Sequence, residues 1–175
     1  MIPAAAYMAE ACRLTIVLVL AVAVAGKAVN AAARRDLSDM IADLVRVPER
    51  AARAGAALVL GAEGLLALLL LAGGGWSRPA MAAAMGLFAI FTGFILLALV
   101  QRRAVVCSCF GGRGHPLSVW DLVRNLILIA AGAIYLSQGP LGHALDPAAW
   151  LLLAGVAFIL FLVSTNLNRI ALLAR

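Results

Sequence analysis

Residues 80–100, AMAAAMGLFAIFTGFILLALV, contain no charged side chain. An α-helix rises about 1.5 Å per residue, so a helix over this stretch is long enough to cross the roughly 30 Å hydrocarbon core of a bilayer. No water is available there, so the backbone must satisfy its own hydrogen bonds, which favours a helix. This stretch therefore decides the fold class, and we predict an all-α, polytopic transmembrane helical bundle.

Apolar runs continue on both sides of this stretch, and 65% of the 175 residues are hydrophobic. A soluble domain is only about 45–50% apolar, so we expect the lipid bilayer to surround the chain. We predict a four-helix core plus a fifth helix in a single membrane domain, residues 1–175. The other four spans are expected at residues 11–29, 54–75, 118–137 and 147–163.

The first span carries a charge near each end. No basic region precedes Arg13, and Lys27 closely follows the apolar run, so we expect this span to be retained rather than cleaved as a signal peptide. Both side chains are predicted to extend to the two interfaces.

A shorter helix is predicted between the first two spans, over residues 36–47. Its apolar side chains recur at helical spacing: Leu37, Met40, Ile41, Leu44 and Val45. This pattern places them on one face, with Asp36 as the cap and Pro48 as the end. The sequence is typical of an amphipathic helix in the membrane interface, although an ordinary connecting helix would show the same pattern.

The net charge of +6 comes from residues that flank apolar runs, so it indicates membrane orientation rather than a nucleic-acid partner. With five crossings, every Lys and Arg except Arg13 and Arg78 falls on one side, together with the loop before residue 118. The positive-inside rule places that side in the cytoplasm and the N-terminus outside, in a multi-pass protein of the cell (inner, cytoplasmic) membrane.

The loop after residue 100 contains two cysteines one residue apart, Cys107 and Cys109. A disulfide between them closes a tight ring, and strained disulfides are easily reduced. The neighbouring Arg102, Arg103 and Arg113 favour the thiolate form. The pattern therefore predicts thiol–disulfide exchange. Three further residues are expected to shape this loop: Phe110 as an anchor, and Gly111 and Gly112 as a tight turn.

Two other interpretations of the loop stay open. Both cysteines could be buried small side chains, as we expect for the distant Cys12. Alternatively, Cys107, Cys109 and His115 would suit copper or zinc, although the usual Cys-x-x-Cys spacing and a fourth ligand are missing. In the main interpretation, no bound cofactor is expected.

Glu63 lies in the middle of an apolar run, where an ionised side chain is costly and needs a partner. Counted from the start of each span, Arg124 reaches a similar depth, so we predict a Glu63–Arg124 pair. Asp121 is one turn from Arg124 and is expected to hold it as well. Such a pair is either a proton relay or polar clamp beneath the thiols, or a structural ion pair that fixes helix register.

The sequence also resembles the MauE family of methylamine utilisation proteins and, more broadly, DoxX-like membrane proteins. The resemblance rests on CSCFG at 107–111, on the Arg-Asn pair Arg124 and Asn125, and more weakly on Gly26, Lys27, Pro48 and Glu63. Ser108 stands where the family usually has Gly, which adds bulk in a tight ring.

This resemblance implies a membrane component that assists maturation of an exported, disulfide-containing client together with a thioredoxin-like partner. It does not fix the client, because many MauE-like proteins occur apart from methylamine metabolism. An exported partner also conflicts with a cytoplasmic loop, so the orientation stays open. The candidate enzyme activity is that of a thiol–disulfide oxidoreductase. The alternatives are a noncatalytic assembly subunit or scaffold with structural or metal-binding cysteines, and a quinone-linked enzyme.

Overall fold

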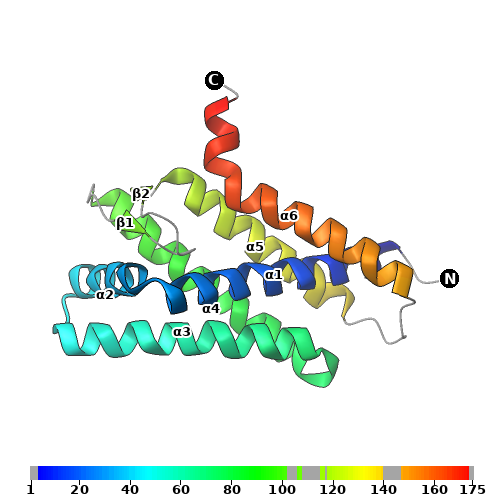
Figure 1. Cartoon of the computed structure of the whole chain (residues 1–175), viewed down its shortest axis with the longest axis horizontal. Helices are drawn as coiled ribbons and strands as arrows, with labels where there is room; N and C mark the ends of the chain where they lie inside the picture. The colour runs from blue at the N-terminus through cyan, green and yellow to red at the C-terminus, as the bar shows by residue number, and fades with distance from the viewer. Residues whose placement is uncertain (1–3, 102–105, 108–114, 117, 140–146, 174–175) are drawn as a thin grey trace.

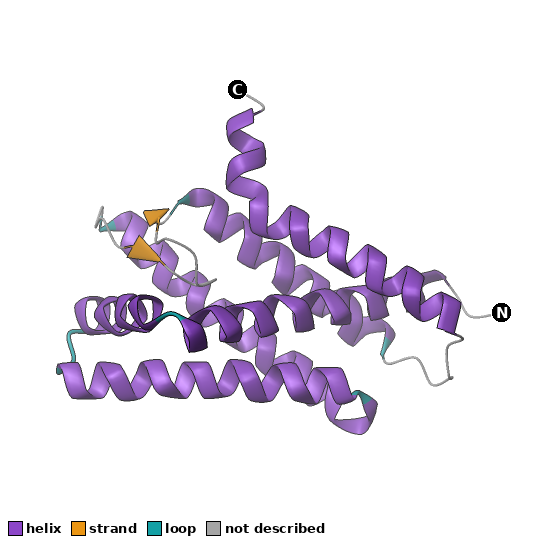
Figure 2. Ribbon diagram, in the orientation of Figure 1, coloured by secondary structure: helices purple, strands orange, loops and turns teal. Residues whose placement is uncertain are grey.

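The computed structural model describes residues 4–101, 106–107, 115–116, 118–139 and 147–173 (Figures 1 and 2). Its helices are α1 (Ala4–Val29), α2 (Ala31–Val45), α3 (Glu49–Ala72), the short 3-10 helix η1 (Gly74–Trp76), α4 (Ser77–Val100), α5 (Val119–Gln138) and α6 (Pro147–Leu173). Two short strands, β1 (Val106–Cys107) and β2 (His115–Pro116), lie between α4 and α5. Five of the helices are long and apolar enough to cross a membrane, which confirms the predicted polytopic bundle.

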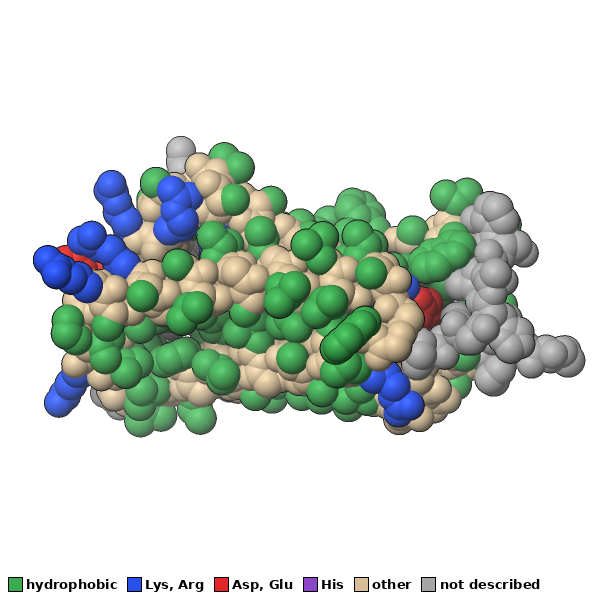
Figure 3. Space-filling model, turned by 90° about the horizontal axis from the view of Figure 1, so that it is seen from below, with side chains coloured by type: hydrophobic (Ala, Val, Ile, Leu, Met, Phe, Trp, Pro, Cys, Tyr) green, Lys and Arg blue, Asp and Glu red, His purple; other side chains and the backbone are tan. Residues whose placement is uncertain are grey.

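Helix α1 occupies the centre of the bundle, where it packs against α3, α5 and α6 (Figure 1). It is the most enclosed of the five spans. In the view of Figure 3, Lys and Arg side chains gather at the two ends of the molecule, and the length between them is mostly hydrophobic. This distribution fits a protein whose middle lies in lipid and whose ends meet water.

Helix α2 starts earlier than predicted, because Asn30 rather than Asp36 caps it. Asn30 has an extended backbone, and its side-chain oxygen accepts a hydrogen bond from the Ala32 amide at 3.0 Å. One residue therefore separates α1 from α2. Arg34 of α2 caps the C-terminal end of α1, because its Nη1 donates to the carbonyls of Lys27 and Ala28 at 2.7 and 2.8 Å. These carbonyls belong to the last turn of α1, where intrahelical donors are lacking.

The apolar face of α2 packs onto the bundle. Leu37 and Met40 form a cluster with Ala56 of α3, and Phe91 of α4 packs against it. Val45, the last residue of the predicted stripe, is instead 49% exposed. The amphipathic helix is thus present, whereas its position in the membrane interface stays a prediction.

Helices α1, α3 and α6 extend well beyond their predicted spans. Helix α1 begins at Ala4, seven residues before the predicted start. Helix α3 begins at Glu49, five residues before the predicted start, and Glu49 forms an ion pair with Arg53 on the next turn. Helix α6 continues to Leu173, and its C-terminal part turns away from the bundle (Figure 1). Near this turn, Ser164 and Thr165 donate hydrogen bonds to the Phe161 carbonyl at 2.9 and 2.8 Å. Such bonds to the preceding turn bend helices.

The end of the bundle opposite α2 is held by a buried arginine. Arg13 was predicted to extend to water, but it is only 4% exposed, so that prediction is wrong. Its guanidinium forms an ion pair with Glu10 and donates to the Leu70 carbonyl in the last turn of α3. Arg78 acts similarly on α5, where it donates to the Leu136 carbonyl at 3.0 Å. Arginines at this end thus satisfy helix C-terminal carbonyls.

Helices α4 and α5 approach closely at Gly132, and this contact gives a stability prediction. A Cβ at Gly132 would lie 2.6 Å from Cγ and 2.8 Å from Sδ of Met85. We expect Gly132→Val to lower the free energy of unfolding by about 1–3 kcal/mol through overpacking, read as a lower unfolding midpoint of the purified protein. Gly86→Val is the matched control, because nothing lies within 4 Å of a Cβ there. Equal midpoints for the two variants would contradict the close contact.

Candidate functional site

The strand pair closes the loop that carries the two cysteines. Strands β1 and β2 are antiparallel, with Cys107 opposite His115 and Val106 opposite Pro116. Cys107 and His115, which flank residues 108–114, are therefore neighbours across the strand pair, and β1 lies against α2 (Figure 1). The predicted residues Cys109, Phe110, Gly111 and Gly112 lie outside the described residues, as do Arg102, Arg103 and Arg113. The parts of the chain that are described contain no group of three His, Cys, Asp or Glu residues suited to a metal ion.

The start of α5, directly after this loop, is fixed by Asp121. One carboxylate oxygen of Asp121 accepts from the Ser118 amide at 3.0 Å and from the Ser118 hydroxyl at 3.1 Å. The other oxygen lies 3.2 Å from Nη1 of Arg124. Asp121 and Arg124 are only 5% and 7% exposed. The predicted Asp121–Arg124 contact is confirmed, and it ties the first turn of α5 to the bundle interior.

Glu63 has a different partner from the predicted one. Nζ of Lys27 lies 2.7 Å from both carboxylate oxygens of Glu63, and each residue is 2% exposed. The predicted Glu63–Arg124 pair is therefore wrong, as is the prediction that Lys27 extends to the interface. The reason is the central position of α1, which packs against both α3 and α5. Lys27, in the last turn of α1, is therefore close enough to bond Glu63 of α3, and it takes the place predicted for Arg124 of α5.

Glu63 and Arg124 nevertheless face the same internal cavity. This cavity has a volume of about 30 Å³ and is lined by residues of five helices. Glu63, Arg124 and Asn125 are its polar lining, and Phe88, Phe91 and Phe94 are its aromatic lining. A cavity of this size has room for about one water molecule. The structure thus brings the predicted residues Lys27, Glu63, Arg124 and Asn125 into one buried polar group, enclosed by apolar side chains.

The buried polar group lies toward the same end of the bundle as the cysteine loop. Lys27 is in the last turn of α1 and Asp121 in the first turn of α5, and both helix ends are at the end where β1 and β2 lie (Figure 1). The family described as "Methylamine utilisation protein MauE" matches residues 5–138 of the chain.

The chain belongs to the MauE family. No curated protein and no solved structure gives a match at a significant level. The MauE match includes the cysteine loop, the Lys27–Glu63 pair and the start of α5, and it ends at the last residue of α5. Together with the five candidate spans, it identifies an integral membrane protein of the MauE family.

A second buried ion pair of this MauE-family protein, besides Lys27–Glu63, was not predicted from the sequence. Glu10 and Arg13 are one turn apart in α1, and both are at most 5% exposed. Their spacing of three residues on a helix is the signal that predicts such a contact. It was missed because the predicted span began at Ala11, which left Glu10 outside the helix. Cys12, next to this pair, is a buried free cysteine, as predicted.

Proposed function

We propose that this MauE-family protein is a membrane thiol–disulfide redox component that relays reducing equivalents through Cys107 and Cys109. Its partner is a thioredoxin-like protein, and its role is the maturation of exported, disulfide-containing proteins. The observation that carries the proposal is the pairing of β1 with β2. Cys107 stands opposite His115, so the strand pair closes the segment that contains Cys109, inside the region matched by the MauE family.

The proposed reaction is a two-electron exchange. The thiolate of one cysteine attacks the disulfide of the thioredoxin-like partner, and a mixed disulfide forms as one partner thiolate leaves. The second cysteine of the pair then attacks the mixed disulfide. This releases the partner as a dithiol and leaves a Cys107–Cys109 disulfide, so two electrons have moved to the partner. A second thioredoxin-like dithiol reduces this disulfide and completes the cycle.

The buried polar group would act in this reaction as a clamp beneath the loop. Both carboxylate oxygens of Glu63 are engaged by Lys27, so accepting a proton would require this ion pair to break. That favours a positioning role over a proton relay. Asp121 has a similar role, because it joins Ser118, the residue that enters α5, to Arg124 inside the bundle.

Trapping of the mixed disulfide tests the proposal. In the full-length membrane protein, one of the substitutions Cys107→Ser and Cys109→Ser removes the resolving thiol. That variant should accumulate a disulfide-linked complex with a thioredoxin-like protein, and a reductant should separate the two proteins. The Cys107→Ser/Cys109→Ser double variant should capture nothing. Cys12→Ser is the matched control, because Cys12 is buried at the other end of the bundle, and it should leave trapping unchanged.

The same experiment decides the orientation and the main alternative. The compartment of the captured protein identifies the side on which the loop lies. Failure of both single variants to trap a thioredoxin-like protein would contradict the redox proposal. A stoichiometric amount of copper or zinc that is lost in Cys107→Ser would instead support a noncatalytic, metal-binding subunit.

A further inference from the structure

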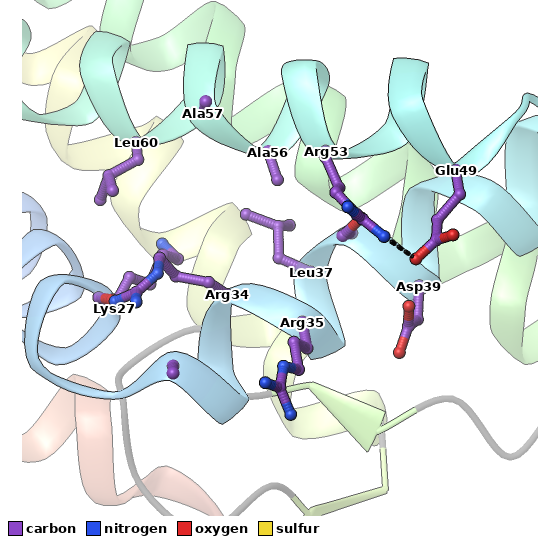
Figure 4. Close-up of a pocket in the computed structure, with 12 residues that line it drawn as sticks. Lys27, Arg34, Arg35, Leu37, Asp39, Glu49, Arg53, Ala56, Ala57 and Leu60 are labelled. Atoms are coloured by element: carbon purple, nitrogen blue, oxygen red, sulfur yellow. Dashed lines mark hydrogen bonds and ion pairs between the residues drawn. The ribbon is translucent and has the colours of Figure 1, made fainter.

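A cleft of about 690 Å³ lies between α2 and the first half of α3 (Figure 4). It shares no lining residue with the internal cavity. Its two walls differ in character. The α2 wall carries Arg34 and Arg35. The α3 wall begins with the Glu49–Arg53 ion pair and continues with the small or apolar side chains Ala56, Ala57 and Leu60. A cleft with one cationic and one apolar wall complements a molecule that is anionic on one side and apolar on the other.

The cationic wall has hydrogen-bond donors available for an anion. Arg34 uses Nη1 for the two carbonyls at the end of α1, and its Nε and Nη2 make no bond to any residue that the structure describes. Arg35 is exposed and makes no hydrogen bond or ion pair within the described ranges. Free guanidinium groups are strong hydrogen-bond donors to phosphate oxygens.

The remaining charges of the cleft are largely engaged. Lys27 is held by Glu63, and Arg53 forms an ion pair with Glu49. Asp39 also lines the cleft, so four cations face two carboxylates there. Once the Lys27–Glu63 and Arg53–Glu49 pairs are excluded, two cations, Arg34 and Arg35, and one carboxylate, Asp39, line the cleft. The cleft therefore has a net positive charge available to a ligand.

The position of the cleft in the bundle decides between kinds of anion. It lies beside α3, one of the candidate membrane spans, and extends along that helix from Glu49 to Leu60. The eleven helical steps from Glu49 to Leu60 correspond to roughly 16 Å, enough to run from the headgroup region into the hydrocarbon. A soluble anion would use only the cationic wall, whereas a membrane lipid would use both walls. Basic pockets between membrane helices commonly receive anionic headgroups.

We propose that the α2–α3 cleft is a binding site for an anionic phospholipid. The phosphate lies against Arg34 and Arg35, and an acyl chain lies over Ala56, Ala57 and Leu60. The proposal does not depend on the redox chemistry of the cysteines, and it holds for either orientation in the membrane.

The test uses the full-length protein in neutral detergent. Phosphatidylglycerol with a fluorophore on one acyl chain is titrated, with phosphatidylcholine of the same acyl chains as the neutral probe. Phosphatidylglycerol should bind more tightly. Arg35→Gln should weaken it about fivefold, the value of one cation near an anionic lipid headgroup, and should leave phosphatidylcholine unchanged. Arg50→Gln is the matched control, an exposed cation at the same end outside the cleft, and it should not change binding.

A second variant tests the apolar wall without changing charge. Ala57 is exposed to the cleft, so Ala57→Trp should fill it and also weaken phosphatidylglycerol binding, while the helical circular dichroism signal stays that of the parent. Equal losses in Arg35→Gln and Arg50→Gln would overturn the proposal in favour of diffuse surface charge. Full binding in both cleft variants would overturn it as well. Displacement of the lipid by millimolar inorganic phosphate would show a site for a free anion instead.

Discussion

Glu63→Gln should lower the free energy of unfolding by about 3–5 kcal/mol, because it leaves the ammonium group of Lys27 buried without a counter-charge. Lys27→Met should cost a similar amount by stranding the carboxylate. Both side chains of this ion pair are 2–3% exposed, so bulk water compensates little for either charge. The double variant should recover much of the loss, since no charge is then left unpaired. Unfolding of the four proteins in detergent, in a double-mutant cycle, measures the coupling.

The exposed Glu49–Arg53 pair provides the control for this cycle. It lies on the same helix as Glu63, but its side chains are 67–68% exposed, so Glu49→Gln should leave the unfolding midpoint almost unchanged. Additive losses for Lys27→Met and Glu63→Gln would show that the two residues do not interact. Slow disulfide exchange in a stable double variant would show that the pair also positions the loop. Unchanged exchange would limit the pair to a structural role.

The second large effect is expected at the other end of the bundle. Arg13→Gln should cost about 3–5 kcal/mol, because it leaves the Glu10 carboxylate buried and unpaired. It also removes the donor to the Leu70 carbonyl. Glu10→Gln should cost less than Arg13→Gln, since Arg13 would keep its bond to that carbonyl and a glutamine oxygen at position 10 still accepts a hydrogen bond. The unfolding free energies of the two variants test this prediction, because the loss should be larger for Arg13→Gln than for Glu10→Gln.

Arg78→Gln is the comparison for Arg13→Gln. Arg78 also donates to a carbonyl at a helix end, but this bond is exposed and no buried carboxylate is involved. It should therefore lower the midpoint by far less. If Glu10→Gln proved as damaging as Arg13→Gln, the bond to Leu70 would have little value, and the ion pair alone would hold α1 at this end.

Apolar run length was sufficient to predict the five spans, because lipid requires an uninterrupted helix of bilayer length. It was not sufficient to place helix ends. Glu49 and Asn30 show why. The first turn of α3 is charged, and Asn30, the cap of α2, lies six residues before Asp36, the predicted cap. Helix ends depend on hydrogen bonds to side chains such as Asn30, which hydrophobic periodicity does not report.

The candidate site shows a similar division. Local contacts on one helix, such as Asp121 with Arg124, follow from helical spacing and were predicted. The choice of Arg124 as the partner of Glu63 relied on depth alone. The depth of a residue in the membrane does not show which helices are adjacent. The central helix α1 packs against both α3, which carries Glu63, and α5, which carries Arg124. Glu63 therefore pairs with Lys27, a residue whose long side chain had been expected to reach water.

The central position of α1 has a consequence for biogenesis. α1 is synthesised first, yet its charged side chains bond to groups made much later. Glu63 follows Lys27 by 36 residues, and Leu70 follows Arg13 by 57 residues. Until α3 has been synthesised, Lys27 and Arg13 lack these partners. α6 covers another face of α1, where Ala157 has no exposed surface, and it lies beyond the region matched by the MauE family. Among the described helices, α1 therefore gains its full set of neighbours only after α6 has been synthesised.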